Sequence, residues 1–210
     1  MARRVFEDIE YYHESDVRGI IENGTLRGFF PNGIALYTYA ARMFDDSLTM
    51  DDITEDYYSH IYGEDYRDFI DYFEKINTVF PYSLISTNAE EGGLKKSIDF
   101  TAEQAKLLDE IDDILNIGRK LVREHYNYDE RVRTVSVRLL EHHIDYVRYF
   151  YEAIKEKYQG NDDIAIARFD EFQEKYGERE IYIQKYFDHV MNFSGLGHLF
   201  RIKSNPFITD

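Results

Sequence analysis

The sequence predicts a mainly α-helical protein, in which an antiparallel helical bundle is preceded by a single β/α unit. Three observations favour this fold class. The 210 residues include only three prolines, so helices can run through most of the chain. From Ile34 onward, apolar residues recur every three or four positions, which is the spacing of one helix face. One short apolar run, Val17–Ile21, instead has the composition of a strand.

Residues 1–46 form the predicted β/α unit. The expected order is a helix over Val5–His13, a strand over residues 17–22, a glycine-rich loop over residues 24–33 and a helix over Ile34–Phe44. Because a stable sheet normally needs three or more strands, this unit is one turn of a β/α architecture without its neighbours. The alternative is that residues 17–21 pack as an irregular segment.

Residues 47–80 predict a pair of helices that pack on this unit. Ser47 and Thr49 precede two aspartates, an arrangement typical of a helix start, and Gly63 ends that helix. The second helix is expected from Asp65 to about Asn77. Residues 81–100 contain a proline and two glycines and are expected to form a connector between subdomains.

Residues 101–193 predict a four-helix antiparallel bundle. Thr101 and Gln104 have the spacing of a capping box, in which each side chain bonds the backbone N–H of the other residue. The four helices are expected over residues 101–126, 129–158, 161–177 and 178–193. The glycines of Ser194–His198 are expected to end the last helix and leave residues 194–210 as a tail.

Charge and composition exclude several function classes. Lys and Arg total 25 against 41 Asp and Glu, a net charge of −16, which disfavours nucleic acid and anionic membrane surfaces as partners. The absence of cysteine excludes disulfides, thiolate metal sites and cysteine nucleophiles, and it leaves the compartment undetermined. No signal peptide and no run of about 20 apolar residues is present, so we expect a soluble chain.

Motifs for metals and cofactors are also missing, so we predict neither. A Glu-x-x-His unit occurs once, at Glu10 and His13, whereas a dinuclear carboxylate centre needs two. His142 and His143 are adjacent and therefore point about 100° apart on a helix. We expect His143 in the core and His142 at the surface. The glycine-rich loop matches neither a P-loop nor a dinucleotide fingerprint.

Glu22 is the carboxylate that the pattern singles out. It follows the apolar strand directly and opens the glycine-rich loop. In a (β/α) barrel, residues at the carboxyl ends of strands line the active site. Alternatively, Glu22 caps the loop or pairs with Arg18 or Arg27. The spacing alone does not decide between these interpretations.

Three segments resemble a bacterial family of large glycoside-hydrolase-like proteins, known as domain of unknown function 4838. The segments are residues 11–24, 36–45 and 51–63, and the resemblance covers about residues 5–77. The family's barrel is similar to that of α-glucuronidases and hexosaminidases. The resemblance implies that the β/α unit is the last unit of a (β/α)8 barrel, followed by a helical region. This chain departs from the family at two positions. It has Asn23 where the family often has Gln, and it has Phe44 where the family often has a Trp nearby.

The resemblance implies that this chain is the C-terminal portion of a carbohydrate-active protein. Glu22 and Asn23 would then contact a glycan, with Arg27 and Tyr37 at the rim of the site. Glycoside hydrolysis needs two carboxyl groups flanking one bond, and the resemblance places them on earlier strands, so no catalytic residue is expected in this chain. The unpaired unit could also pair with a second copy.

Two other interpretations remain. One is a self-contained acidic all-α protein-interaction module without enzymatic activity. The other is a stand-alone hydrolase, which would need a second carboxylate within about 10 Å of Glu22.

Overall fold

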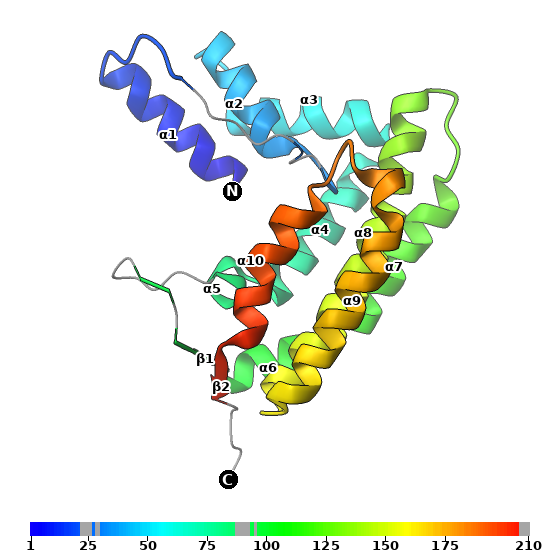
Figure 1. Cartoon of the computed structure of the whole chain (residues 1–210). Helices are drawn as coiled ribbons and strands as arrows, with labels where there is room; N and C mark the ends of the chain where they lie inside the picture. Colours follow the sequence, from blue (N-terminus) through cyan, green and yellow to red (C-terminus); the bar gives the residue numbers. More distant parts are fainter. Residues whose placement is uncertain (22–26, 28–29, 87–92, 95, 206–210) are drawn as a thin grey trace.

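The computed structural model describes residues 1–21, 27, 30–86, 93–94 and 96–205. In this part of the chain the protein is mainly helical, with one small parallel sheet of two strands (Figure 1). The predicted α class is therefore confirmed. The elements are α1 (Ala2–Glu14), α2 (Ile34–Phe44), α3 (Met50–Tyr62), α4 (Tyr66–Val79), α5 (Tyr82–Ile85), β1 (Ser97–Asp99), α6 (Ala102–Leu108), α7 (Ile111–Glu124), α8 (Arg131–Tyr158), α9 (Asp162–Ile183), α10 (His189–Arg201) and β2 (Lys203–Asn205).

The long helices α7, α8 and α9 lie side by side and form the body of the molecule (Figure 1). Helix α8 is joined to α9 by a tight turn at Gly160, whose φ of +79° suits glycine, so the two helices run antiparallel. Helix α4 packs against α7, and α10 packs against α9. The layers of α4, α7, α8, α9 and α10 enclose one continuous apolar core.

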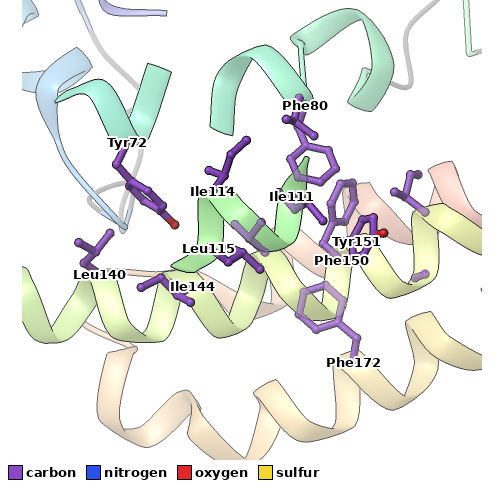
Figure 2. Packing of buried hydrophobic residues seen from close by; sticks show 14 of the residues in the cluster. Tyr72, Phe80, Ile111, Ile114, Leu115, Leu140, Ile144, Phe150, Tyr151 and Phe172 are labelled. Atoms are coloured by element: carbon purple, nitrogen blue, oxygen red, sulfur yellow. The ribbon is translucent and has the colours of Figure 1, made fainter. Parts of the chain in front are cut away.

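The core is rich in aromatic rings. Phe169 and Phe200 stack with their ring centroids 4.7 Å apart, and Tyr62 and Phe69 stack at 4.0 Å. Figure 2 shows aliphatic side chains of α7, among them Leu115, beside Ile144 of α8. This one core extends from α3 to the end of α10, so the helices on either side of residues 81–100 share it.

The predicted helix signals at Thr49, Thr101 and Gly63 are confirmed. Thr49 accepts from the N–H of Asp52 at 3.1 Å, and the Asp52 carboxylate accepts from the N–H of Thr49 at 2.9 Å. Thr101 forms the same reciprocal pair with Gln104. Gly63 ends α3 with a φ of +79°. Local hydrogen bonding therefore determines these helix ends.

The predicted strand over residues 17–22 is wrong over its described part. Residues 17–21 form neither strand nor helix, and their backbone pairs with no described strand. The alternative of an irregular segment is therefore correct as to conformation, but Val17 is 42% exposed and Ile21 is fully exposed, so these two residues are not packed. A run with strand composition forms a strand only when a neighbouring strand supplies hydrogen bonds.

Several predicted helix ends are also wrong. The helix expected over residues 101–126 is broken at Asp109 and Glu110 into α6 and α7. Helix α9 continues through Gly177, and α10 continues through Gly195 and Gly197 into the predicted tail. A glycine inside a helix costs only about 1 kcal/mol, which the packing of α9 and α10 offsets. The structure adds β1, in the predicted connector, and β2, which pair in parallel through residues 97–99 and 203–205.

Helices α1 and α2 pack against each other at one end of the molecule (Figure 1). Ile9 of α1 is buried but does not belong to the main core. The Arg42 guanidinium of α2 lies 4.6 Å from the centre of the Phe6 ring and 3.7 Å from the Glu10 carboxylate. No described helix combines the length and apolar composition that a membrane span requires.

Candidate functional site

Arg27 connects the N-terminal third of the chain to the start of α10. Its Nη2 donates to Oδ2 of Asp188 at 2.6 Å, and its Nη1 donates to the carbonyl of Gln184 at 3.3 Å. Asp188 is also the N-cap of α10, where its Oδ1 accepts from the N–H of Met191. The Met191 N–H and the Arg27 guanidinium together lower the pKa of Asp188. Arg27 is therefore held by a carboxylate that is ionised at neutral pH.

Phe30 anchors the same part of the chain in the helical core. Its ring centroid lies 5.0 Å from that of Phe187, 5.8 Å from that of His143 and 6.1 Å from that of Tyr146. The last two contacts are edge-on, a geometry that aromatic rings prefer. Phe30 thus fixes the positions of Pro31 and Asn32, which follow it along the chain.

Tyr57 of α3 fixes the start of α2. Its hydroxyl accepts a hydrogen bond from the N–H of Gly33, the N-cap of α2, and its ring centroid lies 5.3 Å from that of Tyr37. The Tyr37 hydroxyl donates to the Asp56 carboxylate. That hydrogen bond, together with burial and the charge of Asp56, raises the pKa of Tyr37, so the phenol keeps its proton.

These contacts border a hollow of about 600 Å³ between α3, α8 and the connection from α9 to α10, which we call the tyrosine hollow. Its wall includes the rings of Tyr57 and Tyr186 and the polar side chains of Asn32, Arg131 and Ser136. No carboxylate is among the described residues that line it. Aromatic faces combined with a few polar groups form a surface that can bind a neutral polar ligand.

The structure brings two of the four predicted site residues to the edge of this hollow. Tyr37 contacts the wall through Tyr57, and Arg27 binds Gln184 and Asp188 on either side of Tyr186. Each is one contact away from the hollow. The other two, Glu22 and Asn23, lie outside the described residues.

The expected burial of His143 is confirmed, whereas His142, expected at the surface, is partly buried. His143 is buried with 9% of its surface exposed, whereas His142 is half-buried. His13 lies 3.9 Å from a carboxylate oxygen of Asp46, and Glu10 pairs with Arg42. Over the described ranges, no three His, Asp or Glu side chains come together in a way that could hold a metal ion.

Sequence reasoning missed the hollow itself. Its wall combines residues 31–32, α3, α8 and Tyr186, which are as far as about 150 positions apart in the chain. The only available signal was the high content of tyrosine, and the aromatic core accounts for that equally well.

Comparison with protein-family models, with curated proteins and with solved structures finds no match to this chain.

Proposed function

We propose that this chain is the C-terminal portion of a carbohydrate-active, glycoside-hydrolase-like protein. In this proposal the β/α unit supplies a sugar-contacting strand end, and the helices form a supporting domain. The chain binds sugar together with the rest of the protein and is not catalytic alone. Glu22 and Asn23 contact the sugar, with Arg27 and Tyr37 at the rim.

The observation that carries the proposal is the exposed apolar surface of the N-terminal unit. Helices α1 and α2 pack side by side, and residues 17–21 between them expose Val17 and Ile21 to solvent. From Arg18 to Ile21, the backbone makes no hydrogen bond to a described backbone group. An apolar segment with free backbone groups is suited to pairing with a strand. In a barrel, a neighbouring strand on each side would pair with the backbone N–H and C=O groups of this segment.

Helix α2 supports the same interpretation. Its single charged residue, Arg42, is buried against α1, while Phe44 is 94% exposed. A helix that is apolar all around normally lies inside a protein. Burying one large apolar side chain contributes roughly 1.5–3 kcal/mol, so covering Phe44 and Ile21 would stabilise the unit appreciably.

The tyrosine hollow supports a role in sugar binding. The faces of Tyr57 and Tyr186 can stack on a sugar ring, and the amide of Asn32 and the guanidinium of Arg131 can bond its hydroxyl groups. Hydrolysis needs two carboxyl groups flanking one bond, and none lines the described wall of the hollow. We therefore expect that the 210 residues alone do not cleave sugar.

The test is the intact mass of the native protein, purified from its source and read together with its coding sequence. We expect a mass well above 25.1 kDa, with additional residues that encode β/α units. A native mass of 25.1 kDa would overturn the proposal, and so would a longer protein without β/α units.

The continuous core from α3 to the end of α10 favours a second candidate, an acidic all-α protein-interaction module. Such a core can hold the helices together without a barrel. In that case the exposed surface of α2 and residues 17–21 binds a protein partner. A native mass of 25.1 kDa, together with a protein that copurifies and is lost in the variant Phe44→Asp, would favour this candidate.

A further inference from the structure

A second cavity lies on the other side of Pro31 and Asn32 from the tyrosine hollow. We call it the His143 pocket. Its volume is about 350 Å³, and its wall comes from α4, α8, α10 and the residues after α4. Pro31 and Asn32 line both cavities and separate them. The volume lies at the lower end of the range for small-molecule sites, which corresponds to a ligand of one or two rings.

The wall of the His143 pocket is mainly apolar and aromatic. Phe73, Phe80 and Phe150 contribute rings, and Ile76 and Leu196 contribute aliphatic side chains. No Lys, Arg, Asp or Glu is among the described residues that line it. A charged ligand would lose its hydration there without gaining a counter-charge, so the wall selects for an uncharged one.

Among the polar side chains of this wall, which are those of Asn32, Asn77, His143 and Tyr146, that of His143 has a buried nitrogen without a hydrogen-bond partner. Only 9% of its surface is exposed, and its Nδ1 is buried without a hydrogen bond. Neither ring nitrogen bonds a described residue; its neighbours are the rings of Phe30, Tyr72 and Phe73. Burial lowers the pKa of His143 to about 3, so the imidazole is neutral at physiological pH.

A neutral imidazole has one N–H donor and one acceptor nitrogen. A hydroxyl group can donate to the acceptor or accept from the donor, so it satisfies the ring in either tautomer. An aromatic ring on the same ligand can make edge and face contacts with the surrounding phenylalanines. A carboxylate, an ammonium group or a purely apolar molecule would each fail to meet one of these conditions.

We propose that the His143 pocket binds a small uncharged aromatic compound that carries a hydroxyl group. The ring lies among Phe73, Phe80 and Phe150, and the hydroxyl bonds the imidazole of His143. This inference is independent of the proposed role in sugar binding, because the two cavities have separate walls apart from Pro31 and Asn32.

The test uses equilibrium dialysis of the whole chain with 2-naphthol, and with naphthalene as the probe that lacks the hydroxyl. We expect 2-naphthol to bind roughly three- to tenfold more tightly than naphthalene, the difference made by one net hydrogen bond. In His143→Phe this preference for the hydroxyl should disappear. Equal binding of the two probes to the unmodified chain would overturn the proposal, and so would no binding of 2-naphthol.

Two further variants locate the site. Leu196→Trp fills the His143 pocket from the half-buried side of α10 and should reduce 2-naphthol binding at least tenfold. Val132→Trp, at an exposed position in the wall of the tyrosine hollow, is the matched control and should leave binding unchanged. If Leu196→Trp keeps full binding, or Val132→Trp abolishes it, the probe binds elsewhere and the assignment to the His143 pocket is wrong. These outcomes remain decisive if His143→Phe does not fold.

Discussion

Lys157 is completely buried at the C-terminal end of α8, and its partners determine how the end of the chain is held. Its ammonium group donates to the Asp162 carboxylate at 2.8 Å and to the carbonyl of Ile202. Asp162 also accepts from the hydroxyl of Ser204 at 2.6 Å and from its N–H at 3.2 Å. One carboxylate in the first turn of α9 therefore neutralises a buried cation and positions β2.

The variant Asp162→Ala should reduce the free energy of unfolding by about 3 kcal/mol at pH 7. Removing one partner of a buried ion pair costs roughly 3–5 kcal/mol, because the other charge stays buried without compensation. We take the lower end because the Asp162 side chain is 32% exposed, so water can replace part of its contact. The measurement is urea-induced unfolding followed by circular dichroism.

Asp163→Ala is the matched control. Asp163 lies in the same first turn of α9 and has the same favourable interaction with the helix dipole, but it is exposed and does not bond Lys157. Its replacement should cost only about 0.5 kcal/mol. If Asp162→Ala costs no more than this control, the buried pair does not stabilise the fold as we argue.

The pH dependence gives an independent check. Burial would raise the pKa of Asp162, but the hydrogen bonds from Lys157 and Ser204 outweigh it and lower the pKa below 3.8. A carboxylate whose pKa is lowered on folding contributes stability above its unfolded pKa, and that contribution is lost as the pH falls through the folded value. The difference between the unmodified protein and Asp162→Ala should therefore be constant above about pH 5 and shrink below about pH 4. A difference that does not change with pH would refute the ionic contribution.

Further predictions concern helix geometry and exposed surface. Gly118→Ala should destabilise the fold by roughly 1–3 kcal/mol, because the new Cβ would lie 2.6 Å from the ring of Tyr72. Gly195→Ala should stabilise it by about 0.5–1 kcal/mol, since no atom lies within 4 Å of the added Cβ inside α10; destabilisation there would argue against the helix. Thr49→Val should cost about 1 kcal/mol by removing a cap, as chemical unfolding can measure. Ile21→Asp should leave the free energy of unfolding of the 210-residue chain nearly unchanged, because Ile21 is exposed there. In a longer native protein that covers this residue, the same variant should lower the free energy of unfolding by more than about 2 kcal/mol. Equal effects in both proteins would count against the proposed barrel.

Local signals in the sequence predicted the helix starts well. Ile34–Phe44 was expected as a helix and forms α2 with the same bounds, the helix start expected at Thr49 is present, and so is the predicted capping box at Thr101. These features depend on residues at most four positions apart. Residues within one helical turn are therefore enough to predict these helix starts.

Glycines at helix contacts could not be interpreted in the same way. Gly177 and Gly197 were expected to end helices, yet each lies inside one and packs against a neighbour, His189 and Phe169 respectively. An added Cβ at either position would lie 3.6 Å from that neighbouring ring. Whether a glycine ends a helix or allows a close approach depends on the facing helix, and the pattern along one segment does not contain that partner.

The two cavities illustrate the same limit for function. The burial of His143 could be predicted from its place in an apolar stripe. Its lack of a hydrogen-bond partner, however, depends on Phe30 and on the neighbouring α4 residues Tyr72 and Phe73, which come from two other parts of the chain. Phe30 comes from the glycine-rich loop, which the sequence assigned to a barrel, yet its ring lies in the helical core. The same residue therefore anchors the Pro31–Asn32 wall between the cavities and ties the N-terminal unit to the bundle. A variant that removes this ring, Phe30→Ala, would disturb both cavities at once, so single-cavity variants such as Leu196→Trp and Val132→Trp are needed to assign a ligand to either one.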